Sequence, residues 1–319
     1  MKASVLMITY NHGPFIAEAI ESVLMQQVDF DYELVISDDC SNDGTREIVQ
    51  AYQEQYPDRI KLLLPEKNLG MHRNFVQTLY ACQGQYVAVL EGDDYWTSKD
   101  KLQQQADFLD RNSDFAICFH NALMRFEDVN IEPVNLCTDD FKPVFTLRDL
   151  LRRNIIPTCT AMFRHGLVRE FPDWFFQTGM ADWPFNVFNA MHGKIGYLNR
   201  VMAVYRSHEG GVWSGLSKAR TVEELAKVHL HLNAYLNYEY DEIISAELFK
   251  QWLVLAGLYA NEDDFVRAKE YALKCVNEGP AYKHLPAKSK ILLRAYAPSL
   301  FTLLKKSFFL FRSQGHTPR

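Results

Sequence analysis

The sequence predicts an α/β protein with a mostly parallel sheet flanked by helices, followed by an α-helical C-terminal region. Two observations carry this prediction. Short apolar runs alternate with segments of helical periodicity through the first hundred residues, separated by short polar connections. From about residue 215 the strand signals become rare and helical periodicity dominates. We therefore expect a first domain over residues 1–215 and a helical region over 216–319.

The apolar runs and periodic segments follow one another in strict alternation. We expect strands over residues 4–8, 32–36, 60–64 and 86–90, with helices over 15–26, 45–56 and 74–82. Strands joined by helices through short connections are usually parallel, with right-handed crossovers. In the C-terminal region we expect helices over 222–240, 245–259, 263–277 and 289–311.

Composition limits the classes of protein that this chain can belong to. Its 319 residues are 48% hydrophobic and 23% charged, which is typical of globular proteins. A net charge of -6 gives no general nucleic-acid footprint, so we expect no nucleic acid partner. The first apolar run is too short for a signal peptide, and no long uncharged stretch predicts a membrane span. The six cysteines show no metal-finger spacing, and we expect reduced thiols in a cytoplasmic protein.

Polar clusters follow three of the predicted strands. These are Thr9-Tyr10-Asn11, Asp38-Asp39 and the turn "LEGDDYW" over residues 90–96. Taken alone, the last of these also fits an ordinary polar turn. In open parallel sheets, however, ligands bind beyond the carboxyl ends of the strands, and all three clusters are expected there. Their shared location favours a ligand site.

The chemistry of these clusters indicates a cation. Three carboxylates within four positions repel one another unless a cation balances them. The chain contains no glycine-rich phosphate loop of either common type, so a nucleotide's phosphates would need a divalent cation held by carboxylates. Oxygen ligands favour Mg²⁺ or Mn²⁺.

Four motifs in order resemble the family 2 glycosyltransferases, which have the GT-A fold. They are "SVLMITYNHGPFIAEAIESVLMQQ", "ELVISDDCSNDGTREIV", "EKNLGMHRNF" and "GQYVAVLEGDDYW", within roughly residues 3–215. The resemblance assigns Thr9, Tyr10, Asn11, Asn68 and Gly70 to the nucleotide pocket and Asp39 to the base. It places Asp93 and Asp94 at the ribose, diphosphate and metal, with Glu91 in place of the family's usual first Asp.

The same resemblance points to residues far downstream. Asp182 matches the position of the base that removes the acceptor hydroxyl proton, with Ala181 where a Glu is common. A helix N-cap is the alternative role for Asp182. In "YRSHEGGVWS", His208 is either a metal or diphosphate ligand or an ordinary loop residue, and Arg206 is a candidate for phosphate contacts.

The resemblance implies an inverting, metal-dependent glycosyltransferase. It would move one sugar from a nucleoside-diphosphate-sugar, UDP- or dTDP-linked, to a saccharide or lipid-linked saccharide acceptor. The QxxRW motif of processive synthases is missing. One alternative is a sugar-nucleotidyltransferase. Such enzymes need a glycine- and arginine-rich loop after the first strand, and the segment "TYNHGPF" does not provide it. The other alternative is a non-catalytic sugar-nucleotide-binding scaffold.

Other features leave two interpretations open. Residues 300–311 form an apolar helical face flanked by Lys305, Lys306 and Arg312, which suits either peripheral contact with the inner face of the membrane or a helix docked on the core. Trp96, Trp183 and Trp213 suit either acceptor stacking or core packing. His12 and His72 are expected in loops near the presumed pocket, in contact with solvent. A homo-oligomer is compatible with the sequence.

Overall fold

The structure is a computed structural model that describes residues 1–138, 140–211 and 215–278. The chain divides into two compact units between Gly215 and Leu216. The first unit contains a ten-stranded sheet with helices, and the second contains helices alone among its described residues. This confirms the predicted α/β fold class and the change to helical structure near residue 215.

The N-terminal part of the sheet is parallel, as predicted. Its strands are β1 (Ala3–Thr9), β2 (Tyr32–Asp38), β3 (Ile60–Leu63) and β4 (Tyr86–Val89), in the spatial order β3-β2-β1-β4. The connecting helices are α1 (Ile16–Leu24), α2 (Thr45–Gln55) and α3 (Met71–Ala81). All residues of β1, β2 and β4 are buried, which explains why these strands read as continuous apolar runs rather than as alternating ones.

Beyond β4 the sheet is mixed rather than mostly parallel. Its next strands in space are β9 (Met162–Arg164), β6 (Phe115–Phe126), β10 (Lys194–Ser207) and β5 (Tyr95–Trp96), with β7 (Val134–Asn135) and β8 (Val144–Phe145) at the sides. β9 runs antiparallel to both β4 and β6, while β6 and β10 are parallel to each other. The helices of this part are α4 (Lys101–Arg111), α5 (Leu147–Leu150) and α6 (Asp182–Ala190).

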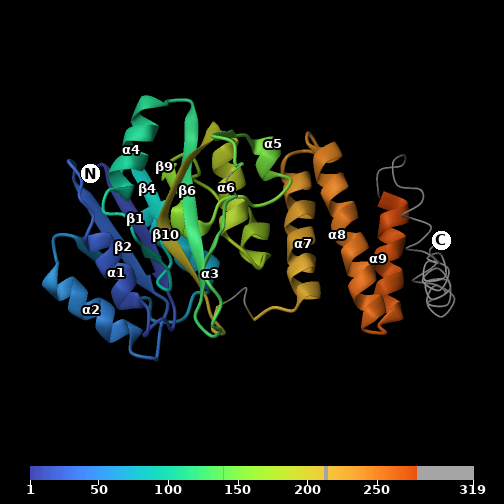
Figure 1. The fold of residues 1–319 in the computed structure, drawn as a ribbon, viewed down its shortest axis with the longest axis horizontal. Coiled ribbons are helices and arrows are strands. Elements are labelled where there is room, and N and C mark those ends of the chain that lie inside the picture. Colours follow the sequence, from blue (N-terminus) through green and yellow to red (C-terminus); the bar gives the residue numbers. More distant parts are fainter. Residues whose placement is uncertain (139, 212–214, 279–319) are drawn as a thin grey trace, which may run out of the picture. The chain divides into compact units, whose positions relative to one another are not determined.

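The hydrophobic core fixes where the polar clusters lie. Helix α1 buries Ile16, Ile20 and Val23 against strands whose apolar side chains are almost wholly inaccessible. Each such side chain stabilises the fold by about 1.5–3 kcal/mol. The register pairs Thr9 with Asp38, so the ends of β1 and β2 lie side by side (Figure 1).

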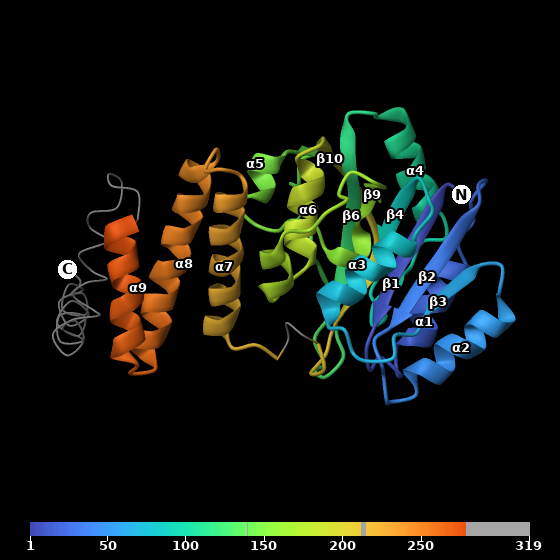
Figure 2. The same ribbon diagram turned by 180° about the vertical axis from the view of Figure 1, so that it is seen from behind.

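The second unit is described as three helices, α7 (Lys218–Tyr235), α8 (Asp241–Asn261) and α9 (Phe265–Glu278), which lie side by side in Figures 1 and 2. Helix α8 is long and apolar enough to cross a membrane by length and composition alone. It packs between α7 and α9 and buries Leu248, Trp252 and Leu255, which is the behaviour of a core helix. The predicted helix over 289–311 and its amphipathic face lie outside the described residues.

Candidate functional site

A cavity of about 650 Å³ opens at the carboxyl ends of the parallel strands. Its size is typical of small-molecule sites. The end of β1, the start of α3, the turn after β4, the segment 153–158 and the start of α6 all contribute to its wall. Of the predicted site residues, it brings together Thr9, Tyr10, Asp39, Asn68, Gly70, Asp93 and Asp182.

The acidic turn after β4 divides its three carboxylates between two directions. Glu91 and Asp93 line the cavity. Asp94 is 1% exposed and points away from it, where its Oδ1 accepts a hydrogen bond of 2.8 Å from the backbone N–H of Arg206. Asp94 therefore fastens β10 to the turn through Oδ1, while its Oδ2 is buried and has no hydrogen-bond partner among the described residues, so its role as a metal ligand stays a prediction.

Gly92 lets this turn approach β1 closely. A Cβ added at Gly92 would lie 2.8 Å from Cβ of Thr9 and 2.9 Å from Cδ1 of Ile16. The Gly92 N–H also donates to the carbonyl of Ile8 at 3.0 Å. Only glycine allows this contact, which holds the acids next to the end of β1.

Asp93 is held by two histidines. Its Oδ2 lies 3.2 Å from Nε2 of His208 and 3.7 Å from Nε2 of His12. His12, expected in a loop near the presumed pocket, lines the cavity and lies against Asp93. Burial raises the pKa of Asp93, but the hydrogen bond from His208 and the charge of His12 outweigh it, so that the net pKa is lowered. The same hydrogen bond raises the pKa of His208, whereas burial lowers that of His12.

The pKa values of Glu91 and Asp94 are raised, in contrast to that of Asp93. Burial, together with the charges of Asp93, Asp94 and Asp182, raises the pKa of Glu91 well above its ordinary value. Burial and the charge of Asp93 raise that of Asp94. A cation at this turn would relieve the repulsion among the carboxylates.

The donor atoms at the turn fit a divalent cation shared with a ligand. Oδ1 of Asp93 is buried and has no hydrogen-bond partner in the described part of the chain. Within the same described residues, no group of three or more His, Cys, Asp or Glu side chains has the geometry to hold a metal by itself. Mg²⁺ is usually held by one or two carboxylates, with substrate phosphates completing its shell. Asp93 provides such a carboxylate, and His208 lies directly against it.

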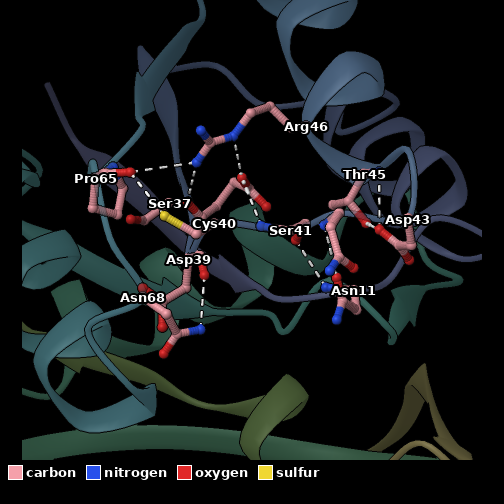
Figure 3. Close-up of polar contacts among 12 residues, drawn as sticks. Asn11, Ser37, Asp39, Cys40, Ser41, Asp43, Thr45, Arg46, Pro65 and Asn68 are labelled. Atoms are coloured by element: carbon pink, nitrogen blue, oxygen red, sulfur yellow. Dashed lines mark hydrogen bonds and ion pairs between the residues drawn. The ribbon is translucent and has the colours of Figure 1, made fainter.

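Asp39 anchors the loop over residues 68–70, which lines the cavity; Figure 3 shows its contact with Asn68. Its two carboxylate oxygens accept the backbone N–H groups of Leu69 at 2.7 Å and Gly70 at 2.9 Å. The Asn68 side chain donates to the Asp39 carbonyl at 2.8 Å. Gly70 has a φ of +79°, which favours glycine. These contacts place Asp39, Asn68 and Gly70 together on the cavity wall.

The three residues that follow β1 do not share one role. Thr9 is 2% exposed and its Oγ1 has no partner in the described structure, while Tyr10 is 47% exposed, and both line the cavity. Asn11 does not line it. Its Oδ1 accepts the N–H of Asn42 at 3.0 Å, and its own N–H donates to Ser41 Oγ at 2.8 Å (Figure 3). Asn11 therefore braces the loop after β2, and its place in a nucleotide pocket stays a prediction.

Asp182 reaches the cavity from the first residue of α6. The N-cap residue is Ala181, so Asp182 does not take the alternative N-cap position. Its Oδ2 accepts a hydrogen bond of 2.5 Å from Nδ2 of Asn154, and Asn154 accepts one of 3.3 Å from Asn186. Burial raises the pKa of Asp182, which suits a group that accepts a proton. Sequence reasoning missed both asparagines, because no local motif marks them.

Arg206 and two of the tryptophans make contacts within the fold. The Arg206 guanidinium donates to Glu18, to Glu127 Oε1 at 3.2 Å and to the Asp93 carbonyl at 2.6 Å, so it is already paired. The indole N–H groups of Trp96 and Trp183 donate to backbone carbonyls, and each side chain is 1% exposed. These two tryptophans are core residues, and Trp213 lies outside the described residues.

Two curated proteins illustrate the sequence similarity of this chain to known proteins. The uncharacterized protein Rv1520 of Mycobacterium tuberculosis is 35% identical over 215 residues, which are 66% of this chain and 60% of that relative. Abequosyltransferase RfbV of Salmonella typhimurium is 32% identical over 111 residues, 34% of this chain and 33% of its own. The chain thus spans 60% of the length of the mycobacterial relative.

Solved structures share the fold. TarS of S. aureus in complex with UDP-GlcNAc has a TM-score of 0.58 and 23% identity, covering 92% of this chain and 81% of TarS. Mannosyltransferase PcManGT from Pyrobaculum calidifontis, in complex with GDP-Man and Mn²⁺, has a TM-score of 0.58 and 18% identity, covering 96% and 83%. The model of the family described as glycosyl transferase family 2 matches residues 4–170, more than half of the sequence. The chain therefore belongs to glycosyl transferase family 2.

Proposed function

We infer that this protein is an inverting, metal-dependent glycosyltransferase that moves one sugar from a nucleoside-diphosphate-sugar to a saccharide or lipid-linked saccharide. The observation that carries the proposal is one cavity with two separated carboxylates. Asp93 offers an unpartnered oxygen at the acidic turn, and Asp182 lies in the same wall with a raised pKa.

The donor is assigned to the side of the cavity formed by β1, β2 and the acidic turn. Asp39 and the loop it holds would receive the base, and Thr9 Oγ1 offers a free polar atom nearby. A UDP-sugar is the first choice and a dTDP-sugar the second. The complexes of TarS with UDP-GlcNAc and of PcManGT with GDP-Man support a nucleotide-sugar donor.

Asp93 would hold Mn²⁺ or Mg²⁺, with His208 as the neighbouring candidate ligand. The ion supplies Lewis-acid stabilisation of the negative charge that develops on the departing diphosphate. His208 fixes the orientation of the Asp93 carboxylate. Asp94 keeps His208 in reach by fastening the end of β10 to the same turn.

Asp182 would take the proton from the acceptor hydroxyl. The hydrogen bond from Asn154 holds the Asp182 carboxylate in the cavity wall, where it could meet the acceptor hydroxyl. Inversion requires the hydroxyl to attack from the face opposite the leaving diphosphate. A base and a metal site on different segments of one cavity wall provide that arrangement.

The proposal is tested by thermal stabilisation and donor turnover. We expect one nucleotide sugar from a panel of UDP-, dTDP- and GDP-sugars to raise the melting temperature in Mn²⁺ but not in chelator. Asp93→Asn should abolish this stabilisation, whereas Asp58→Asn, an exposed carboxylate outside the cavity, should preserve it. Equal stabilisation in chelator, or in Asp93→Asn, would overturn the metal-dependent assignment.

A further inference from the structure

The cavity has a second region that the donor assignment does not use. Its wall here is formed by the segment 153–158 and by three apolar side chains, Met124, Leu136 and Phe141. These three are only partly buried although each is apolar. They line the same cavity as Asn154 and Asp182. An apolar surface of this kind is open to a ligand with an apolar portion.

Arg153 places a positive charge on this apolar wall. Two arginines line the cavity, Arg153 and Arg206. Arg206 is buried and saturated by Glu18 and Glu127. Arg153 is exposed, and within the described residues it has neither an ion pair nor a hydrogen bond. Its contact is with the face of Phe141, 5.9 Å from the ring centroid.

The position of Arg153 relates it to the reacting hydroxyl. Asn154, the next residue, donates to Asp182 at 2.5 Å. Consecutive Cα atoms are about 3.8 Å apart, so Arg153 and the base partner leave the same short stretch of backbone. Because Arg153, Asn154 and Asp182 all line one cavity, a group bound by the guanidinium would share that cavity with the hydroxyl that Asp182 deprotonates.

We propose that Arg153, with Met124, Leu136 and Phe141, forms a subsite for an acceptor that carries an anionic phosphate or carboxylate beside an apolar portion. Guanidinium binds both oxyanions in a planar, two-pronged geometry. Among the described residues that line the cavity, His12 and Arg206 are paired with carboxylates, and Arg153 is the cationic side chain left open to an acceptor anion. Calling this ligand the acceptor rests on the proposed function.

Binding of short amphiphiles tests the subsite directly. The probes are octyl phosphate, octyl glucuronide and octyl glucoside, used below their micellar concentrations with the full chain in low salt. We expect at least one anionic probe to bind about tenfold or more tightly than octyl glucoside, the scale of one charge-assisted contact at a partly exposed site. Preference for octyl phosphate identifies a phosphate acceptor, and preference for octyl glucuronide identifies a carboxylate acceptor.

Matched variants distinguish anion binding at Arg153 from nonspecific attraction by other positive charges. Arg153→Ala and Arg153→Gln should remove the preference for anions without changing the affinity for octyl glucoside. Arg152→Ala deletes an adjacent exposed arginine that faces Asp149 and should keep the preference. Raised salt should weaken the anionic probes alone.

Two results would overturn the proposal. One is wild-type protein that binds anionic probes no more tightly than octyl glucoside, which includes no binding at all. The other is a preference that survives in both Arg153 variants. UDP and UDP-sugar binding, measured in parallel, keeps the two claims apart. Anion binding at Arg153 without nucleotide binding would leave the subsite standing and remove the proposed transferase function.

Discussion

Replacing Asp182 by Asn tests the proposed base most directly. The change preserves the size of the side chain, and it keeps an oxygen that Asn154 can donate to. What it removes is the ability to accept the proton of the acceptor hydroxyl. Loss of a general base typically lowers turnover by about a hundredfold or more, equivalent to about 2.7 kcal/mol of barrier.

The thermal stability of Asp182→Asn should be unchanged or higher, although its activity falls. Burial raises the pKa of Asp182, so the folded state binds the proton more tightly than the unfolded state does. The carboxyl group therefore contributes most stability at low pH, and this contribution is lost as pH rises through the unfolded and then the folded pKa. At neutral pH we expect Asp182→Asn to melt at the same temperature as the wild type or higher.

The assay combines nucleoside diphosphate release, donor affinity by calorimetry and thermal melting. Turnover of the wild type should fall as pH decreases through a pKa above the ordinary 3.8, and this acid limb should vanish in the variant. Asp173→Asn, an exposed carboxylate outside the cavity, is the control and should behave as wild type. Preserved turnover with weakened donor affinity would refute the base assignment.

Three further substitutions probe the surroundings of the site. Asn154→Ala removes the hydrogen-bond donor that stabilises ionised Asp182. Turnover should fall about tenfold, which is on the low side of acid–base effects, and the acid limb of the pH profile should move to higher pH. An unchanged pH profile would contradict the contact. Asp39→Asn turns an amide toward two backbone N–H groups, which should cost about 1–3 kcal/mol of unfolding free energy in urea and weaken nucleotide binding. Gly92→Ala forces a methyl group against Thr9 and should cost about 1–3 kcal/mol, so an unaltered urea midpoint would contradict the close approach.

The sequence determined the order of strands and helices in the first unit. In continuous apolar runs such as 4–8 and 32–36, the side chains on both faces of the strand must be buried, and a central parallel strand provides that burial. The same logic located Asp39 and Asp93, because residues that directly follow such strands must emerge at one edge. Four ordered motifs then indicated the family, and the family model confirmed it.

The mixed half of the sheet was not predictable in the same way. Strand β9 has three residues and lies between β4 and β6, which are separated from it along the chain. Pairing over such distances depends on which edges remain free after the parallel core has formed. The sequence of a three-residue apolar stretch does not indicate which strands it will pair with.

Side-chain direction within the site was decided by tertiary structure alone. Asp93 and Asp94 are adjacent acids in one motif, yet Asp93 lines the cavity and Asp94 fastens β10, because the backbone N–H of Arg206 donates to the Asp94 carboxylate. Asn154 is 28 residues from Asp182 and becomes its partner through folding. Local periodicity reports burial, which is an average property of a segment. The direction in which a polar side chain points depends on which distant atoms the fold brings within about 3 Å of it.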